Sequence, residues 1–283
     1  MKETDISGSD AAREADRALK AKHRAMWALG DYPAVATEVI AELGPELAAA
    51  AGAAPGIRVL DVAAGSGNAA TAAALAGAEV VASDLTPELL EVGRSQAEAA
   101  GAKLEWRQAD AEDMPFGDAE FDAVMSCVGV MFAPHHQATA DELVRVCKPG
   151  GRIALTNWTP QGFIGQMFAT MKPYAAPPPP GAQPPPLWGD PDHVRALLGD
   201  RVEDFSAERR QLAVGHFGGP EEFRDYFKAN YGPTIAVYRN IADDPEKVAA
   251  LDQALAELPE KFRLDGDSPV LTWEYLLVTA RRR

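Results

Sequence analysis

The chain has 283 residues, and its 42 acidic against 27 basic residues give a formal net charge of −15. A surface this acidic repels phosphate backbones, so we expect no nucleic-acid partner. The first ten residues are polar rather than a secretion signal, and no apolar run approaches the roughly 18 residues of a membrane span. We therefore expect a cytoplasmic protein without a membrane partner. Cys127 and Cys147 lie in apolar stretches, which predicts neither a disulfide framework nor a metal site.

Two helical segments open the chain. Residues 11–29 carry alanine, leucine, Met26 and Trp27 among mixed charges at helical spacing, and residues 34–50 repeat the pattern after Gly30-Asp31-Tyr32-Pro33. Both precede the first strand pattern, so we expect residues 1–52 to form a helical cap outside the sheet. Such a cap can close over a bound ligand as a lid. The apolar positions of this cap could also support a homodimer.

From residue 57 short apolar runs alternate with alanine-rich helical segments. This alternation is typical of a doubly wound, mostly parallel sheet with helices on both faces. Thr86 before Pro87 predicts a capped helix over residues 87–100, which Gly101 ends. The predicted strands are residues 57–62, 79–83, 103–108, 121–127, 151–157, 204–214 and 271–280.

Two insertions interrupt this α/β domain, which we assign to residues 53–283. The first, near residues 159–189, contains Pro177 to Pro180 and Pro184 to Pro186 and predicts a stiff loop. A helix follows from Asp190-Pro191 to about Gly199. The second insertion, near residues 216–265, is helical. Both insertions lie where they could shape a site for a substrate that accepts a transferred group.

The run from Ile57 to Asn68 joins a buried strand to a turn of small residues, Asp61-Val62-Ala63-Ala64-Gly65-Ser66-Gly67. Glycine there lets the backbone approach a ligand that a larger side chain would exclude. Asp84 closes the second strand, where its carboxylate can accept both hydroxyls of a ribose; Thr86 is left to cap the helix. Asp61, under the turn, can orient backbone amides or reach an ammonium group. These residues predict a nucleotide-like cofactor.

The wider pattern resembles the class I S-adenosylmethionine-dependent methyltransferases, especially the subgroup that includes ubiquinone and menaquinone biosynthesis methyltransferases. The resemblance covers residues 20–158 and departs from the family at Ala63, where glycine is common. It implies a seven-stranded Rossmann-like sheet with an antiparallel last strand, and S-adenosylmethionine as cofactor, leaving S-adenosylhomocysteine. The matching pieces are the turn from Asp61 to Gly67, Asp84 as the ribose acid, Ala109-Asp110-Ala111 with Met114-Pro115-Phe116 as the adenine motif, Phe121-Asp122-Ala123-Val124, and Arg145-Val146-Cys147-Lys148-Pro149-Gly150-Gly151-Arg152.

By this resemblance, Asp110 accepts a hydrogen bond from the adenine amino group, Ala111 offers its backbone amide to the ring, and Leu85 packs against it. The backbone of Cys127 and Val128 lies near the sulfonium. The expected cofactor-binding residues are therefore Asp61, Ala63, Gly65, Gly67, Asn68, Asp84, Leu85, Asp110, Ala111, Cys127 and Val128.

Methyl transfer from a sulfonium is an in-line displacement that needs alignment and a dry pocket. A base is needed only where the acceptor must lose a proton early. His135 and His136, after the fourth strand, are the candidate catalytic bases. Aromatic, soft and amide side chains of the cap and insertions predict a mostly apolar acceptor pocket; they are Trp27, Tyr32, Met131, Asn157, Trp158, Phe163, Met167, Trp188, Tyr226 and Tyr231.

We therefore expect methyl transfer to a small, largely apolar or aromatic metabolite, a natural-product or quinone-like acceptor, at carbon, oxygen or nitrogen. Gly65-x-Gly67-x-x-Ala70 also satisfies the dinucleotide fingerprint. An NAD(P)-dependent oxidoreductase thus stays open, although the Lys148-Pro149-Gly150-Gly151 turn and a terminal antiparallel strand count against it. A non-catalytic S-adenosylmethionine-binding protein is the third hypothesis.

Overall fold

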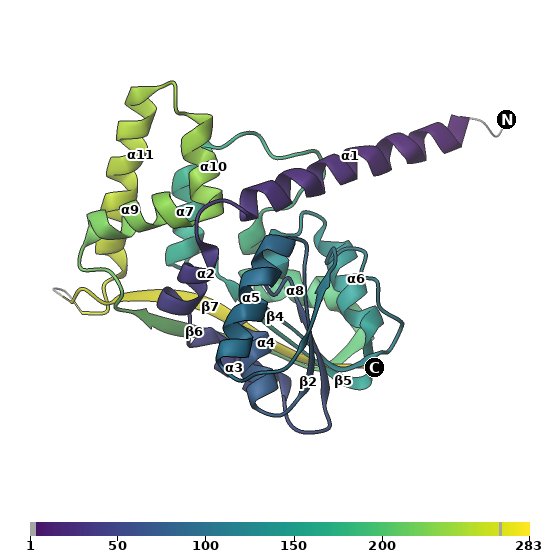
Figure 1. Cartoon of the computed structure of the whole chain (residues 1–283). Coiled ribbons are helices and arrows are strands. Elements are labelled where there is room, and N and C mark those ends of the chain that lie inside the picture. The colour runs from purple at the N-terminus through teal and green to yellow at the C-terminus, as the bar shows by residue number, and fades with distance from the viewer. Residues whose placement is uncertain (1–3, 266–267) are drawn as a thin grey trace.

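The computed structural model describes residues 4–265 and 268–283. Its centre is a seven-stranded sheet in the order β3-β2-β1-β4-β5-β7-β6, in which only β7 runs antiparallel to its neighbours (Figure 1). This confirms the predicted doubly wound, Rossmann-like sheet with an antiparallel last strand. The strands are β1 (Arg58–Val62), β2 (Glu79–Asp84), β3 (Glu105–Gln108), β4 (Phe121–Cys127), β5 (Cys147–Trp158), β6 (Val202–Val214) and β7 (Leu271–Arg282).

Helices cover both faces of the sheet, as the alternating pattern predicts. The crossovers β1-α4-β2 and β2-α5-β3 step toward one edge, whereas β4-α6-β5 steps toward the other, and right-handed crossovers then place the helices on opposite faces. One layer is α3 (Leu43–Ala51), α4 (Asn68–Leu75) and α5 (Pro87–Ala99); the other is α6 (His136–Val146) and α8 (Pro191–Leu198). Both faces of β1 and β4 are therefore covered, and all but one residue of each strand is buried.

The expected cap of residues 1–52 divides into two parts. The segment predicted as one helix over residues 34–50 is α2 (Tyr32–Ala34), a π-helical turn (Val35–Val39) and α3. Leu43 and Leu47 of α3 are completely buried, and Gly44 lets α3 approach the Asn68 backbone of α4. Helix α3 thus packs in the layer on the sheet, and the division of the chain at residue 52 stays a prediction. What remains outside is α1 (Thr4–Trp27) with the turn to α2.

The insertions build a separate helical group at one end of the sheet (Figure 1). It consists of α7 (Phe163–Met171), α9 (Pro220–Asn230), α10 (Gly232–Asn240) and α11 (Pro245–Glu257). Residues 175–184 form a loop without helix or strand, as the prolines predict. The C-terminal end of α1 packs beside α10, where Gly30 fits against the Asn230 backbone. The other end of α1 projects from the body (Figure 1).

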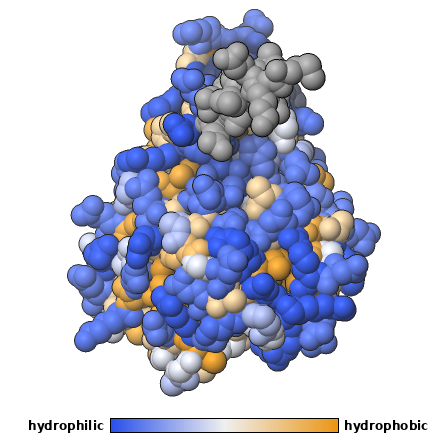
Figure 2. All heavy atoms as spheres, turned by 90° about the vertical axis from the view of Figure 1, so that its right-hand side faces the viewer, coloured by the Kyte–Doolittle hydropathy of each residue, from blue (hydrophilic) through white to orange (hydrophobic). Residues whose placement is uncertain are grey.

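The surface is largely polar on the face shown in Figure 2, where apolar residues form small separate groups. The described large apolar side chains that are exposed are only Leu75, Val92 and Leu264. Among the described helices, none combines the length and the apolar character needed to cross a bilayer. A homodimer stays a prediction.

Candidate cofactor and active site

The turn after β1 is held in left-handed backbone conformations. Gly65 and Gly67 have φ of +58° and +77°, and Ala63 has φ of +52°. A left-handed conformation costs a non-glycine residue roughly 1–2 kcal/mol, so the alanine stores strain at the position where glycine is common. Gly129, after β4, packs so closely that an added Cβ would overlap the Ala63 carbonyl oxygen. The turn is thereby fixed between β1 and β4.

Asp84, the last residue of β2, ties this turn to the start of α5. Its side chain is buried; Oδ2 accepts the Gly65 N–H at 2.8 Å and Oδ1 accepts the Thr86 N–H at 2.8 Å. Burial raises the pKa of the Asp84 carboxyl, and these hydrogen bonds oppose the rise. The predicted start of α5 is correct, but the Thr86 side chain makes no capping hydrogen bond. Asp84 instead accepts the N–H of Thr86 itself and retains lone pairs for a ligand.

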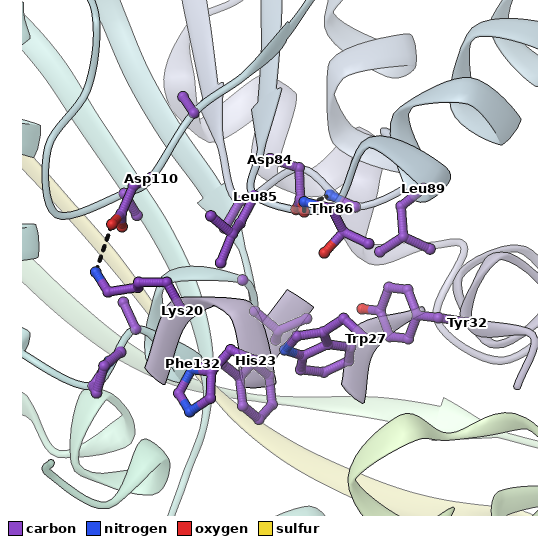
Figure 3. Close-up of a pocket in the computed structure, with 18 residues that line it drawn as sticks. Lys20, His23, Trp27, Tyr32, Asp84, Leu85, Thr86, Leu89, Asp110 and Phe132 are labelled. Atoms are coloured by element: carbon purple, nitrogen blue, oxygen red, sulfur yellow. Dashed lines mark hydrogen bonds and ion pairs between the residues drawn. The ribbon is translucent and has the colours of Figure 1, made fainter. Parts of the chain in front are cut away.

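A cavity of about 660 Å³, including the part that opens to solvent, lies over the carboxyl ends of the strands (Figure 3). The side toward the sheet, here called the floor, includes Ala63, Gly65, Asp84, Leu85, Asp110, Ala111 and Val128. The opposite side, here called the roof, consists of Lys20, His23, Trp27, Tyr32 and Phe132. The floor contains seven of the eleven residues expected to bind the cofactor.

The other four expected cofactor residues do not line the cavity. Asp61 is completely buried, and neither of its carboxyl oxygens has a hydrogen-bond partner among the described residues. Burial raises the pKa of Asp61 to about 8, so the carboxyl is mostly protonated at neutral pH. Asn68 Nδ2 donates to the Cys127 sulfur at 3.8 Å, and Gly67 is the N-cap residue before α4. Burial raises the pKa of the Cys127 thiol to about 12, so it remains a thiol.

Lys20 forms ion pairs that join α1 to the loop after β3. It is 8% exposed, and its Nζ lies 2.6 Å from Asp110 Oδ2 and 2.6 Å from Glu112 Oε2. On the other side of the cavity, Arg24 donates to Glu88 of α5 at 2.9 Å. Helix α1 is therefore attached through side-chain contacts both to the loop after β3 and to α5.

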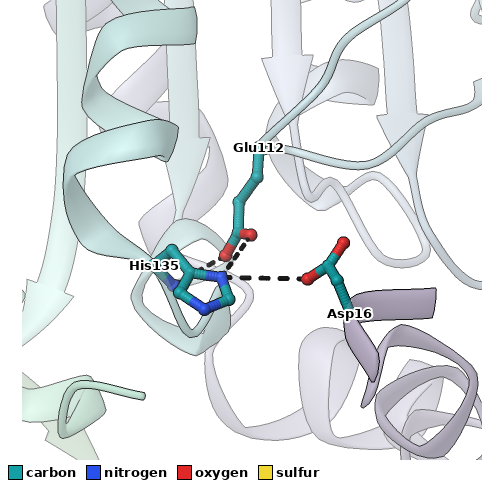
Figure 4. Close-up of side chains that lie close together, drawn as sticks. All are labelled: Asp16, Glu112 and His135. Carbon is teal, nitrogen blue, oxygen red and sulfur yellow. Dashed lines mark hydrogen bonds and ion pairs between the residues drawn. The ribbon is translucent and has the colours of Figure 1, made fainter. Parts of the chain in front are cut away.

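Asp16, Glu112 and His135 come close enough for a metal ion to be considered (Figure 4). Glu112 accepts the His135 backbone N–H at 2.7 Å and lies 2.8 Å from His135 Nδ1, while Asp16 is 3.9 Å from that nitrogen. The Lys20 ammonium already supplies a positive charge 2.6 Å from Glu112. We therefore interpret the group as part of the attachment of α1.

The two predicted catalytic histidines do not line the cavity. His135 faces Glu112, and His136 is buried against Trp188, with its Nδ1 3.0 Å from His193 Nε2. Burial lowers the pKa of His136 to about 4. The histidine that does face the cavity is His23 of α1. Burial, with the nearby Lys20 charge adding to it, lowers the pKa of His23, which is therefore neutral at pH 7.

A sequence signal for the inward face of α1 lies outside the motifs that predicted the cofactor site. Asp16, Lys20, His23 and Trp27 are spaced by four, three and four residues, which places them on one side of a helix. Three of the four are polar, so the stripe has the composition of a solvent-facing surface. The spacing alone therefore does not show that this face covers a cavity.

Of the ten side chains expected at the acceptor, Trp27 and Tyr32 line the cavity. Tyr231 lies behind them, with ring centroids 5.8 Å from Trp27 and 6.3 Å from Tyr32. Tyr226 donates to Glu38 near the surface at 3.0 Å. The other six are at most 4% exposed and are packed in the interior: Met131, Asn157, Trp158, Phe163, Met167 and Trp188.

Comparisons with known proteins agree with this geometry. Residues 60–155 match the family model described as a methyltransferase domain. The chain is 55% identical over 260 residues to the uncharacterized protein Rv1403c of Mycobacterium tuberculosis, covering 92% of this chain and 94% of the relative. It is 44% identical over 104 residues to a demethylmenaquinone methyltransferase of Clavibacter sepedonicus, covering 37% of this chain and 42% of that enzyme.

Among solved structures, a geranyl diphosphate methyltransferase in complex with SAM has the same fold, with a TM-score of 0.52 at 17% identity. The match covers 86% of this chain and 85% of that one. Fold, family model and relatives define the class: the chain belongs to the class I S-adenosylmethionine-dependent methyltransferases.

Proposed function

We propose that this chain binds S-adenosylmethionine in the cavity under α1 and transfers its methyl group to a small, largely apolar or aromatic acceptor. One observation carries the proposal: the buried Asp84 carboxylate lies on the cavity floor and is hydrogen-bonded to the glycine turn at Gly65. A carboxylate that can accept hydrogen bonds from ribose hydroxyls thus lies beside a glycine turn whose backbone a ligand can approach closely. Sheets of this kind bind their ligands at such a topological switch point.

The floor residues fit the cofactor by their chemistry. Asp84 retains lone pairs for ribose hydroxyls, and the glycine turn leaves room for close backbone approach. Leu85 and Ala111 supply apolar contact for a base, with Asp110 beside them. When bound, the cofactor supplies a methyl group activated by a positively charged sulfur. The chain must then align the acceptor and exclude water, and the aromatic roof suits both tasks.

The charges around the cavity favour an acceptor without a positive charge. Asp84 accepts two backbone N–H groups, and Asp110 is paired with Lys20. Among the described lining residues, an ammonium acceptor would therefore find no carboxylate that does not already accept hydrogen bonds from the protein. Aromatic rings of Trp27, Tyr32 and Phe132 instead offer apolar contact. The demethylmenaquinone methyltransferase relative, named for a quinone substrate, supports a quinone-like or natural-product acceptor.

Where the acceptor must lose a proton, we assign proton acceptance to His23 instead of His135 or His136. His23 lines the cavity and is neutral at pH 7, so its imidazole can accept a proton from a hydroxyl or an acidic carbon position. A carbon acceptor makes this role more necessary than a readily ionised oxygen does.

The test is isothermal titration of the wild type and Asp84→Ala with S-adenosylmethionine, S-adenosylhomocysteine and NADH. We expect micromolar binding of both adenosyl compounds and roughly 10- to 100-fold weaker binding by the variant, because hydrogen bonds to a charged, buried group are worth about 1.5–3 kcal/mol. Asp118→Ala is the matched control, since the Asp118 side chain is 77% exposed and pairs only with Arg145 among the described residues.

Binding of NADH alone would contradict the proposal and restore the oxidoreductase alternative. If the adenosyl compounds bind, a panel of aromatic and prenylated acceptors is assayed for formation of S-adenosylhomocysteine. Binding without turnover across the panel would favour the non-catalytic alternative.

A further inference from the structure

The roof presents aromatic rings where the cavity passes over the glycine turn. The Trp27 ring centroid lies 5.3 Å from that of Tyr32 and 4.7 Å from that of Phe132, and all three line the cavity. Their planes meet at 79° and 69°, the edge-to-face arrangement that aromatic rings prefer. Tyr231, 4% exposed, supports Trp27 from behind. These contacts fix the orientation of the Trp27 ring.

Among the described residues that line this part of the cavity, both carboxylates already accept hydrogen bonds from the protein. The oxygens of Asp84 accept the Gly65 and Thr86 N–H groups, and Asp110 is held by Lys20. Asp61 lies below the turn and does not line the cavity. A positive charge entering here therefore lies near aromatic rings as well as near the Asp84 carboxylate.

The position of the rings relative to the floor indicates which part of the cofactor they would contact. Tyr32 covers Gly65, because a Cβ added to that glycine would lie 3.2 Å from Tyr32 Cε1. Asp84 is bonded to the same Gly65 at 2.8 Å. The ribose acid and the glycine turn are thus adjacent beneath the Trp27–Tyr32 pair, and the ribose is joined to the sulfonium by a single carbon.

We propose that Trp27, with Tyr32 and Phe132, recognises the sulfonium charge by cation–π attraction and so makes the cavity prefer S-adenosylmethionine to its neutral product. This inference rests on the proposed function and adds a specificity-determining residue to it. Once the methyl group has left, the sulfur is uncharged and the attraction is lost. The lid helix therefore holds the donor more strongly than the product, which favours product release.

The experiment compares the two affinities in each variant, measured by titration with S-adenosylmethionine and with S-adenosylhomocysteine. Both ligands lose the same apolar contact when the ring is removed, so the ratio of their dissociation constants isolates the charge. Trp27→Leu should lower the preference for S-adenosylmethionine about tenfold, and Trp27→Phe should lower it less, since tryptophan is the strongest cation–π partner. Phe168→Leu is the control, because Phe168 packs 5.9 Å from Phe132 but does not line the cavity.

An unchanged ratio in both Trp27 variants would overturn the inference while leaving the cofactor assignment intact. If Trp27→Leu loses both ligands, the ratio in Trp27→Phe decides, because that variant keeps a ring in place. A wild type that binds neither adenosyl compound would instead defeat the proposed function. The two failures are therefore distinguishable.

Discussion

The floor and the roof of the cavity are held by different kinds of contact. The floor is fixed by left-handed backbone at Ala63 and Gly65, by close packing of Gly129, and by buried hydrogen bonds to Asp84. The roof is attached through ion pairs between residues far apart in sequence, such as Lys20 with Asp110, and through aromatic contacts. The Arg24–Glu88 pair of the roof is exposed, and pairs of that kind contribute little individually. We therefore expect the floor to be the more rigid of the two, and α1 to be able to move without disturbing it.

The largest effect should come from breaking the floor. In Gly129→Ala the added methyl group overlaps the Ala63 carbonyl oxygen, and neither backbone can move freely. We expect a loss of about 3 kcal/mol in the free energy of unfolding, at the upper end of overpacking costs, measured by urea denaturation. The control is Gly219→Ala, where an added Cβ meets nothing within 4 Å. Equal stability of the two variants would show that the floor is not rigid.

Acidification should weaken the sheet domain through His136 on α6. Its pKa of about 4 in the folded protein is below the unfolded value of about 6.5, so the unfolded state binds more protons between these values. Stability is therefore retained above pH 6.5 and falls as the pH drops toward 4. Between pH 7.5 and 5 the loss from this residue is about 2 kcal/mol.

Thermal and urea unfolding at both pH values test this expectation. His136→Leu should remove about 2 kcal/mol of the pH dependence, whereas a substitution at the partly exposed His216, His216→Asn, should leave it in place. A wild-type pH dependence that persists in His136→Leu would assign the acid sensitivity to other groups.

Loosening the roof should have a smaller and local effect. Lys20→Met leaves Asp110 and Glu112 without their shared cation, so α1 should detach more often. We expect amide hydrogen exchange in α1 to accelerate about tenfold, which corresponds to about 1.4 kcal/mol, with exchange in α4 unchanged. Lys22→Met, at an exposed position of the same helix, is the matched control. Faster amide hydrogen exchange in both α1 and α4 would contradict the view that the roof can move independently of the floor.

The smallest effect should come from relieving strain in the floor. Ala63→Gly removes a left-handed alanine, a gain of roughly 1–2 kcal/mol, offset by about 0.4–1 kcal/mol of added freedom in the unfolded chain. The melting temperature should rise slightly. Ala64→Gly, next to it and without a positive φ, should lower the melting temperature. A matching decrease at Ala63 would show that its conformation carries no strain.

Much of the floor could be predicted from the sequence because its signals are local. A buried strand that ends in glycine, followed by an acid at the end of the next strand, fixes Gly65 and Asp84 without distant residues. The seven strand positions follow for the same reason, since each apolar run is bounded by its own turn residues. The match to the methyltransferase family confirms the class that these motifs indicate.

The residues of the roof could not be predicted from the sequence, because their positions depend on packing that no local pattern encodes. The charged stripe of α1 could face solvent or the loop after β3, and only the folded chain shows that Lys20 and His23 turn inward. Aromatic residues such as Phe163 and Trp188 suit a pocket and a core equally well, and burial placed them in the core. The strand positions, the glycine turn and the acid at the end of the second strand follow from the sequence alone, because each is encoded by residues near one another in the chain. The helix that covers the cavity and the side chains that line it follow only from the folded chain, because those contacts join segments about 90 residues apart.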